Sequence, residues 1–470
     1  LLQYLSKKQK TTLRTLAKYK ICICPTPLVH DWIHWIKIIK NKCTKIKTQI
    51  RCINYKLKTS QTQLRGQLLH KDRKKFYKKF IYSTNPLQKG TSTIWNETTQ
   101  SNTTTPSELK NVLLREAKKI LQNPTSPPPN PPKWFNEGYR WNAKNLDEDI
   151  WLPLISKITP SEVKSALNGP PKAPGYDGVT NTILKLAING NKSTPNLFLR
   201  HLTLISNLWF SSGICPTLCS IGRMKLIPKQ GKKHPTKFGN QRPLTLQPEI
   251  AKITLRVLAT RMQTILHKHK VLHHAQKAYI VGGSVDHCLN NLLNHMEQSY
   301  AENRPLFILF HDMKKAFDNT QWWIIKKTFS RFAIPPQFQK FILNYLKASK
   351  TFISTTHGPT PLLSLKNSVK QGDPLSGYLY IFTLDLLHEL CDNCKTFSEK
   401  QIGFRWNSKH TANEGYADDL TNLSGREKGI KELTNLDCEY SDLQSTALEP
   451  LKTNFFGLNL TPEITMNLQK

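Results

Sequence analysis

The sequence predicts an α+β fold in which helices pack on an antiparallel sheet. Three observations lead to this fold class. Helical periodicity and short strand-like runs alternate beyond residue 150. The continuous apolar run Leu306–Phe310 is typical of a strand buried on both faces. The sequence Y-A-D-D at Tyr416–Asp419, with an aromatic and a small residue before two acids, suits a tight strand–turn–strand.

Several other elements follow from local patterns. Residues 91–105 are rich in Thr, Ser and Asn and predict a loop, and a helix is expected over Pro106–Leu121. Ser161–Leu167 predicts a short helix, because Glu162 would lie in its first turn. Apolar residues recur at helical spacing over Ile250–Leu266, which predicts a longer helix.

Prolines divide the chain. A stiff, extended linker is predicted within residues 124–150, and we place a domain boundary there. The prolines that predict it are Pro124, Pro127, Pro128, Pro129, Pro131 and Pro132. Residues 1–123 then form a basic, helical N-terminal region, and no internal repeat is detected.

The charge of the chain predicts a polyanionic partner. The 470 residues include 68 Lys and Arg against 32 Asp and Glu, a formal net charge of +36. Basic residues release counterions from phosphates, so nucleic acid is the first candidate and an anionic membrane surface the alternative. No apolar run is long enough to span a bilayer. Residues 71–80 mix Lys and Arg with aromatic residues, which suits an RNA-binding arm; a solvated basic helix or a disordered arm is the alternative.

The ten cysteines do not indicate a disulfide scaffold in a chain of this length. One group has zinc-capable side chains, namely Cys22, Cys24, His30 and His34. Its C-x-C spacing is unusual for zinc, and neighbouring tryptophans favour an apolar helix instead. The Cys391-x-x-Cys394 pair has no second pair nearby and is a weaker candidate.

Three aspartates suggest a metal site. Asp418 and Asp419 are adjacent, and like charges at this separation repel unless a cation lies between them. A surface turn is the alternative for this pair alone. Asp312 lies just past the predicted strand, where a second carboxylate could join the first two. Two-metal phosphoryl transfer uses carboxylates from separate strands to hold cations ~3.5–4 Å apart. We interpret Asp318 as structural, capping the next helix.

Seven motifs, in order over roughly residues 150–457, resemble those of the reverse transcriptases of non-LTR (LINE-type) retrotransposons. They are Ala173–Gly178 (A-P-G-Y-D-G), Leu226–Lys229 (L-I-P-K), Gln241–Leu244 (Q-R-P-L), Asp312–Asp318 (D-M-K-K-A-F-D), Gln371–Ser376 (Q-G-D-P-L-S), Tyr416–Asp419 (Y-A-D-D) and Leu451–Thr453 (L-K-T). Each motif alone is modest, but together they make a chance resemblance very improbable. The resemblance implies a right-hand polymerase fold with fingers at residues 151–305 and an antiparallel palm sheet at residues 306–460.

The resemblance also implies roles for the acids. Asp312, Asp418 and Asp419 match the triad that binds two Mg²⁺ ions. Phe317 matches the bulky residue that blocks the 2′-hydroxyl of an incoming nucleotide, because an aromatic ring under the sugar leaves no room for the extra oxygen. Ordinary core packing is the alternative for Phe317.

The remaining site residues follow from the same resemblance. Lys229 and Arg242 match finger residues that grip the triphosphate, although a solvated surface lysine is the alternative at position 229. Gln371 and Gly372 match a segment that contacts template and nucleotide, where glycine permits close backbone approach. Lys452 matches a lysine that protonates or stabilises pyrophosphate, with a loop lysine as the alternative.

The sequence departs from the family pattern at three places. Gly377 replaces the usual proline, which predicts a looser turn, and Gln276–Tyr279 replaces a glycine–aromatic pairing. Leu420–Ser424 is more polar than a buried hairpin arm should be. The family's primer grip, thumb and endonuclease domain are not found, so we expect the fingers and palm of a larger protein. A decayed copy that only binds nucleic acid is the alternative.

The expected partners are an RNA template, a DNA primer or target, and deoxynucleoside triphosphates. The family implies a nuclear or cytoplasmic ribonucleoprotein, and no membrane association is expected. An intron-type or telomerase-like enzyme remains a rival of the same class, and a membrane-binding basic protein a more distant one.

Overall fold

The computed structural model describes one compact unit, which begins at Lys89. The described residues are 90–140, 146–170, 173–189, 196–231, 233–393, 402–406, 409–449 and 453–460. The basic run at residues 71–80, the Cys22 group, Cys394 and Lys452 lie outside these residues, so their predictions stay predictions. The described cysteines, Cys215, Cys219, Cys288, Cys391 and Cys438, are free thiols.

The unit begins with a short hairpin and a helix. Strands β1 (Trp95–Asn96) and β2 (Ser101–Asn102) pair within the segment predicted as a loop. Helix α4 (Pro106–Leu121) has the bounds that the sequence predicts, and it begins where the Thr105 hydroxyl accepts a hydrogen bond from the Glu108 N–H.

Helix α4 packs on the sheet of the fingers. This sheet has the order β4-β3-β6-β7, with β8 pairing on β6. Its strands are β3 (Ile221–Pro228), β4 (Gln241–Leu246), β6 (Lys350–Thr355), β7 (Gly358–Pro359) and β8 (Leu363–Ser364). Leu109 and Leu113 of α4 share one apolar cluster with Met224 of β3 and Ile353 of β6. The predicted boundary at residues 124–150 therefore falls inside the unit, because α4 buries its apolar face on elements beyond that segment.

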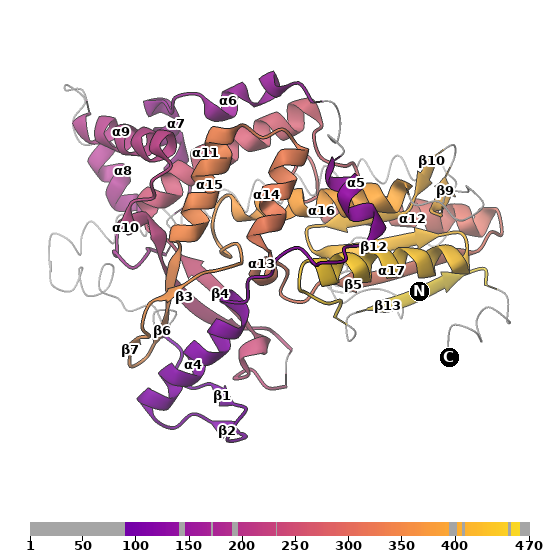
Figure 1. Cartoon of the computed structure of the whole chain (residues 1–470), viewed down its shortest axis with the longest axis horizontal. Helices are drawn as coiled ribbons and strands as arrows, with labels where there is room; N and C mark the ends of the chain where they lie inside the picture. The colour runs from indigo at the N-terminus through magenta and orange to yellow at the C-terminus, as the bar shows by residue number, and fades with distance from the viewer. Residues whose placement is uncertain are drawn as a thin grey trace, which may run out of the picture. The chain divides into compact units, whose positions relative to one another are not determined.

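Further helices form the rest of the fingers layer and its connection to the palm (Figure 1). They are α5 (Lys133–Arg140), α6 (Leu152–Ile155), α7 (Pro160–Ala166), α8 (Asn181–Asn189), α9 (Leu197–Ser212), α10 (Thr217–Ser220), α11 (Glu249–His269), α14 (Trp322–Arg331) and α15 (Pro336–Ala348), with the 3₁₀ turns η3 (Glu148–Trp151) and η4 (Phe238–Asn240). The predicted helix around Glu162 is α7, in which Glu162 and Thr159 form a reciprocal capping box. Arg261 of α11 then binds Glu162 through Nε–Oε1 at 2.6 Å, which joins α7 to α11.

The palm is a four-stranded antiparallel sheet with the order β11-β12-β5-β13. Its strands are β5 (Leu306–Asp312), β11 (Asn413–Tyr416), β12 (Asp419–Ser424) and β13 (Asn454–Leu458). The helices α12 (Val285–Ala301), α16 (Ser376–Asn393) and α17 (Glu427–Leu443) contact these strands, and a small hairpin, β9 (Phe404–Trp406) with β10 (Lys409–Thr411), lies beside α12 (Figure 1). The predicted buried strand is β5, and the predicted antiparallel palm sheet is present. Residues 306–460 do not form the palm alone, because β6, β7 and β8 pair in the other sheet with β3 and β4. None of the described helices is long and apolar enough to cross a membrane.

The polar residues of β12 have partners inside the core. Asn422 is buried and donates a hydrogen bond to the Asp437 carboxyl of α17. The Ser424 hydroxyl donates to the Ile402 carbonyl oxygen at 2.7 Å. Buried polar groups are tolerated when they are paired, so the polarity of this strand is not a sign of decay.

Candidate active site

The palm sheet brings the three predicted acids together at one end. Asp312 is the last residue of β5, and its Cα lies opposite that of Asp419, the first residue of β12. Opposed residues of antiparallel strands have Cα atoms ~4.5–5.5 Å apart. Asp418 lies in the two-residue turn between β11 and β12. Three carboxylates this close repel each other without a cation, so this set of oxygen donors fits hard divalent cations.

The acidic turn has a constrained backbone. Ala417, the other turn residue, has a φ of +58°, a conformation in which hairpin turns usually have glycine. Gln276 clamps this residue from both sides: its Oε1 accepts a hydrogen bond from the Ala417 N–H at 2.9 Å, and its Nε2 donates to the Ala417 carbonyl oxygen at 3.4 Å. The N–H of Lys277 also donates to the Gly415 carbonyl oxygen at 2.9 Å.

Gln276 is therefore a positioning residue for the acidic turn. Its side chain is buried and makes no contact with the cleft itself. In the sequence, Gln276 stands out only as part of a departure from the family pattern. Its role could not be predicted from the sequence, because Gln276 and Ala417 are 141 residues apart and no local pattern links them.

Two departures from the family pattern compensate each other. Gly377 is buried in the first turn of α16, and a Cβ there would lie 2.3 Å from two carbons of the Tyr279 ring. The missing side chain at position 377 therefore makes room for the aromatic ring at position 279. The prediction of a looser turn at Gly377 is wrong, because this residue is held inside a helix. Burial raises the pKa of the Tyr279 hydroxyl, with Asp418 and Tyr416 adding to the shift, so this hydroxyl stays neutral.

Phe317 lies beside the acids, and both its ring and its backbone are held by neighbouring residues. Its ring stacks on that of Tyr380, with centroids 4.9 Å apart. Its carbonyl oxygen accepts a hydrogen bond from the Val369 N–H at 2.9 Å, which links it to the segment containing Gln371 and Gly372. The Gln371 carbonyl oxygen in turn accepts from the Thr245 N–H of β4 at 2.9 Å.

Gly372 meets the geometric need that the sequence analysis assigned to it. Its φ is +105°, and an added Cβ would lie 3.0 Å from the Thr245 carbonyl oxygen. Any other residue would therefore be strained here. The close approach to β4 holds the Gln371–Gly372 segment against the fingers sheet.

Cationic side chains face the acids from the fingers. Lys229 follows β3, and Arg242 lies on β4 opposite Ile227. The Lys229 N–H donates to the Asn240 carbonyl oxygen at 2.9 Å, and its Nζ donates to that of Gly239 at 3.2 Å. Lys315, which follows β5 of the palm and was not predicted as a site residue, adds a third cation to the lining of the cleft. Its role could not be predicted from the sequence, because an isolated lysine in so basic a chain does not indicate a binding site.

Asp318 is a further acid that the sequence interpretation misplaced. It lies within the short helix α13 (Ala316–Asn319) and does not cap the next helix, whose N-cap is Gln321. Burial raises the pKa of Asp318 to about 7, against the opposing effect of Lys315 and Lys229. Asp318 lines the same cleft, so it adds a titratable group beside the cations.

A single cleft of about 560 Å³ collects these groups. The predicted residues that line it are Asp312, Asp418, Asp419, Lys229, Arg242, Phe317, Gln371 and Gly372. Lining residues that the sequence analysis did not assign to the site are Tyr279, Lys315 and Asp318. Acids come from the palm and most of the cations from the fingers, an arrangement that can hold metal ions and a polyphosphate side by side.

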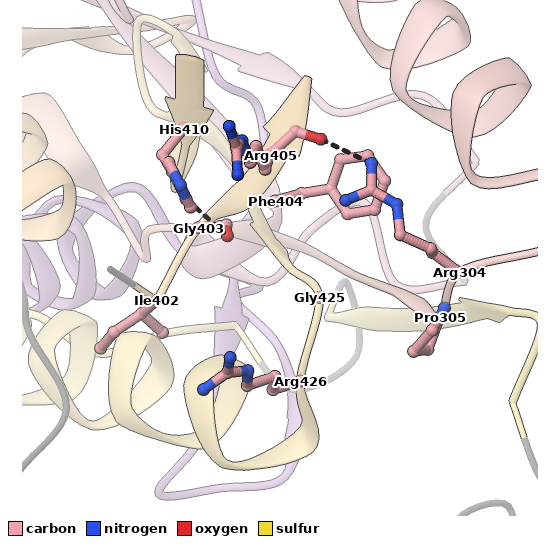
Figure 2. A pocket seen from close by; sticks show the side chains of 9 residues that line it. All are labelled: Arg304, Pro305, Ile402, Gly403, Phe404, Arg405, His410, Gly425 and Arg426. Atoms are coloured by element: carbon pink, nitrogen blue, oxygen red, sulfur yellow. Dashed lines mark hydrogen bonds between the residues drawn. The ribbon is translucent and has the colours of Figure 1, made fainter. Parts of the chain in front are cut away.

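A second, basic pocket lies at the other end of the palm sheet (Figure 2). Its volume is about 410 Å³, and it is lined by Arg304, Arg405, Arg426 and His410 without any acidic residue. Arg304 precedes β5 and Arg426 follows β12, so the length of these strands, at ~3.3 Å per residue, separates the pocket from the acids by ~20 Å. Arg304 is held over the Phe404 ring at 5.1 Å and donates to the Arg405 carbonyl oxygen at 2.9 Å. It also pairs with Glu302, which lies outside the lining, through Nε–Oε2 at 2.5 Å, so its positive charge is partly neutralised.

Comparisons with known proteins agree with this architecture. Residues 227–458 match the family model for reverse transcriptases (RNA-dependent DNA polymerases). The chain is 26% identical over 317 residues to the Pol polyprotein of the R2 type-1 retrotransposable element of Nasonia vitripennis, covering 67% of this chain and 28% of that protein. It is 31% identical over 268 residues to the corresponding R2 protein of Popillia japonica, covering 56% and 34%.

Two further similarities are more distant. The RNA-directed DNA polymerase of the mobile element jockey of Drosophila melanogaster is 26% identical over 238 residues, covering 50% of this chain and 25% of that protein. The chain thus spans about a third or less of the length of these curated relatives. A solved structure of apo telomerase from Candida tropicalis, truncated from its C-terminal domain, aligns with a TM-score of 0.39 and 13% identity over 58% of each chain.

The fingers, the antiparallel palm and the acidic turn define a right-hand polymerase of the reverse transcriptase class. Within this class, residues 227–458 match the reverse transcriptase family, and the similarity to the R2 and jockey proteins agrees with the non-LTR resemblance that the motifs predicted. Members of this polymerase class use divalent metal ions, and the carboxylates at the end of the palm sheet are oxygen donors of the kind that such ions prefer.

Proposed function

We propose that this chain adds deoxynucleotides to the 3′ end of a DNA primer, with RNA as the template, in the cleft between palm and fingers. One observation carries the proposal. Eight residues predicted from separate motifs, spread between Lys229 and Asp419, line the same cleft. Acids for metal ions, cations for a triphosphate and an aromatic residue beside the sugar are the groups that nucleotide addition needs, and all of them lie in this one cleft.

The acids would hold two Mg²⁺ ions. Asp312 and Asp418 are the proposed main ligands, with Asp419 as an auxiliary one, because their oxygen donors suit a hard cation. When bound, the ions would lower the pKa of the primer 3′-hydroxyl and neutralise charge on the leaving pyrophosphate. The protein's part is to hold the three carboxylates at fixed positions, through strand pairing and through the clamp that Gln276 places on the turn.

The other side chains would bind and select the nucleotide. Lys229 and Arg242 are proposed to contact the triphosphate, and Lys315 would add a third cation in the same cleft. Phe317 would lie under the sugar and exclude a 2′-hydroxyl, since stacking on Tyr380 prevents its ring from moving aside. Gln371 and Gly372 would contact template and nucleotide, and Lys452 is proposed to protonate the pyrophosphate.

The nucleic-acid partners are supported by charge. A net charge of +36 and a second basic pocket suit a long polyanion that extends past the cleft. We propose an RNA template and a DNA primer or target as these partners, and a nuclear or cytoplasmic ribonucleoprotein as the setting.

Primer extension tests the proposal. The chain is incubated with a primed RNA template, deoxynucleotides and Mg²⁺, beside Asp418→Ala and beside Asp442→Ala, which removes an exposed acid at the end of α17. We expect extension by the parent and by Asp442→Ala, and loss of nearly all extension with RNA binding retained in Asp418→Ala. RNA binding without extension by the parent would favour the decayed copy. Extension that survives Asp418→Ala would refute the site.

A further inference from the structure

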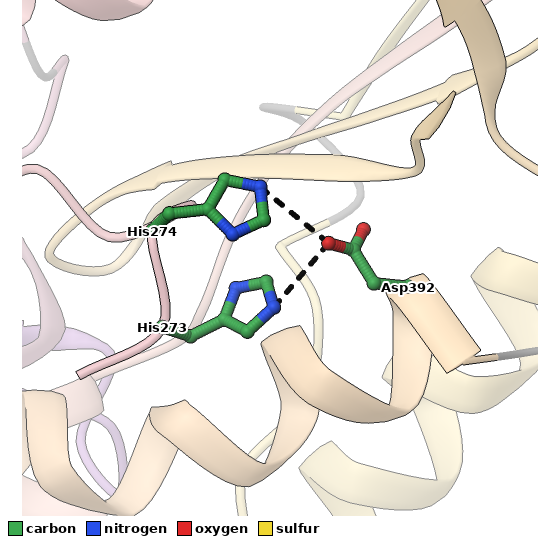
Figure 3. Close-up of side chains that lie close together, drawn as sticks. All are labelled: His273, His274 and Asp392. Carbon is green, nitrogen blue, oxygen red and sulfur yellow. Dashed lines mark ion pairs between the residues drawn. The ribbon is translucent and has the colours of Figure 1, made fainter. Parts of the chain in front are cut away.

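We propose that His273, His274 and Asp392 form a binding site for a divalent transition-metal ion, with Zn²⁺ as the best match. The three side chains converge from two parts of the sequence (Figure 3). His273 and His274 precede Gln276 in the chain, and Asp392 lies at the end of α16. The possible ligand atoms all lie within 4.8 Å of one another. This group lies outside the cleft and is not part of the polymerase site.

The separations between the ligand atoms fit a tetrahedral ion. His273 Nε2 lies 3.3 Å from Asp392 Oδ2, and His274 Nε2 lies 3.6 Å from the same oxygen. Zinc bonds of ~2.0–2.1 Å to nitrogen and oxygen place neighbouring ligands of a tetrahedron ~3.3 Å apart. Both separations to Asp392 match this spacing, and the two histidine nitrogens, which lie within 4.8 Å of each other, would draw together by up to ~1.5 Å around the ion, leaving one position for water.

The ligands are held by a second layer of contacts. Asp392 Oδ1 accepts a hydrogen bond from the Ala412 N–H at 3.3 Å, which leaves Oδ2 directed at the histidines. The backbone N–H of His273 donates to Asp385 Oδ1 at 2.5 Å, which holds the segment, and the His273 ring stacks on that of His388, which limits the rotation of the ring.

The ligand types separate this site from the Mg²⁺ site. Two imidazoles and one carboxylate suit zinc and its neighbours in the transition series, whereas Mg²⁺ prefers oxygen ligands. The competing arrangement is a hydrogen-bonded cluster without metal. In that arrangement His273 Nε2–H donates to Asp392, and His273 Nδ1 accepts from the Ala275 N–H at 3.3 Å. Binding of zinc would require the other tautomer of His273, so the two arrangements exclude each other.

A metal here would brace the acidic turn. The segment of His273 and His274 continues directly into Gln276, which clamps Ala417, and the Ala275 carbonyl oxygen accepts from the Gly415 N–H at 3.1 Å. Zinc would thus tie the end of α16 to the segment that positions the acids. This consequence rests on the proposed function, whereas the binding itself does not.

Zinc content measures the proposal without reference to polymerase activity. The full chain is prepared with Cys22→Ser and Cys24→Ser, so that these thiols do not contribute. It is stripped with a chelator, reloaded with Zn²⁺ in excess Mg²⁺, and analysed by mass spectrometry after gel filtration. We expect His273→Ala and Asp392→Asn each to lose one equivalent of Zn²⁺. The drop in affinity should exceed the ~10- to 100-fold cost of losing an outer contact.

Asp392→Asn separates the two arrangements. Its amide oxygen can still accept the hydrogen bonds from the histidines, and only the 3.3 Å bond from the Ala412 N–H to the other position is lost. A metal-free cluster would therefore largely survive this change, whereas a zinc ligand would be lost. The matched control is His267→Ala with His269→Ala, which removes two exposed histidines of α11. Equal zinc content in the parent, His273→Ala and Asp392→Asn would overturn the proposal.

A second measurement uses only the parent chain, so it tests the proposal even if the variants fail to fold. Co²⁺ replaces zinc in the parent chain, and tetrahedral nitrogen and oxygen ligation gives a visible absorption that six-coordinate Co²⁺ lacks almost entirely. We expect this absorption at one equivalent and its loss on adding Zn²⁺. Its absence from the folded parent would also overturn the proposal.

Discussion

Replacing Gln276 by leucine should slow the polymerase without weakening its hold on nucleic acid. The Gln276 side chain accepts hydrogen bonds from the N–H groups of Ala417 and Ala278, at 2.9 and 3.0 Å. Leucine has nearly the same volume but no acceptor. Each buried N–H left without a partner costs about 1–3 kcal/mol. The turn at Ala417, with its positive φ, can avoid this cost by relaxing, and relaxation displaces Asp418.

The expected loss of activity follows from that displacement. A shift of ~1 Å in a reacting group can cost ~100-fold in rate. Single-nucleotide primer extension on an RNA template should therefore show kcat lowered by about 100-fold in Gln276→Leu. The KM for the deoxynucleotide should change little, because the finger cations are untouched.

A neighbouring residue provides the control for Gln276→Leu. Lys277 holds Gly415 through its backbone N–H alone, so Lys277→Ala keeps that hydrogen bond and should retain kcat within a few-fold. If Gln276→Leu folds and extends primers at the parental rate, Gln276 does not position the acidic turn.

Four other changes have defined outcomes. Phe317→Ala should admit ribonucleotides, since nothing else is assigned to fill the space under the sugar; unchanged sugar discrimination in incorporation assays would exclude this role of Phe317. Gly377→Ala places a Cβ against the Tyr279 ring, so it should lower the free energy of unfolding by about 1 kcal/mol more in the parent than in a Tyr279→Ala background. The same effect in both backgrounds, measured by chemical denaturation, would contradict the compensation. Burial raises the pKa of Asp437 to about 8, so the folded chain keeps a proton that the unfolded chain releases, and this contribution to stability is lost as pH rises towards 8. Relative to Asp437→Asn, the parent should therefore lose up to ~1.4 kcal/mol of stability per pH unit between pH 5 and 8. If the free energy of unfolding of the two proteins followed parallel curves against pH, Asp437 would be ionised in the folded chain. Arg426→Glu in the basic pocket should weaken RNA binding and reduce its dependence on salt, whereas an unchanged slope would exclude phosphate contacts there.

Local patterns were enough to predict elements whose stability comes from nearby residues. Helix α4 has its predicted bounds because Pro106, the Thr105 cap and its apolar spacing all act within the helix itself. The strand β5 was predicted because a run buried on both faces needs no alternation. Short pairings such as β1–β2 were missed, since their few polar residues resemble a loop.

The predicted site residues came from motifs, and the structure decides their relation to one another. The motifs predicted the acids, the cations and the residue that excludes the 2′-hydroxyl. Along the chain, however, Asp312 and Asp419 are more than a hundred residues apart. Strand pairing places these two opposite each other, and the β3–β4 hairpin brings Lys229 and Arg242 to the same cleft.

The sequence by itself determined the composition of this protein: a strongly basic chain, three acids suited to divalent metal ions, and the motifs of a non-LTR reverse transcriptase. Only the tertiary structure decided which residues support those acids. The clamp of Gln276 on Ala417, the fit of Tyr279 against Gly377 and the meeting of His273 with Asp392 each join segments about a hundred residues apart or more. Local patterns report the conformation of one segment, whereas hydrogen bonds and van der Waals contacts between segments depend on how the whole chain packs.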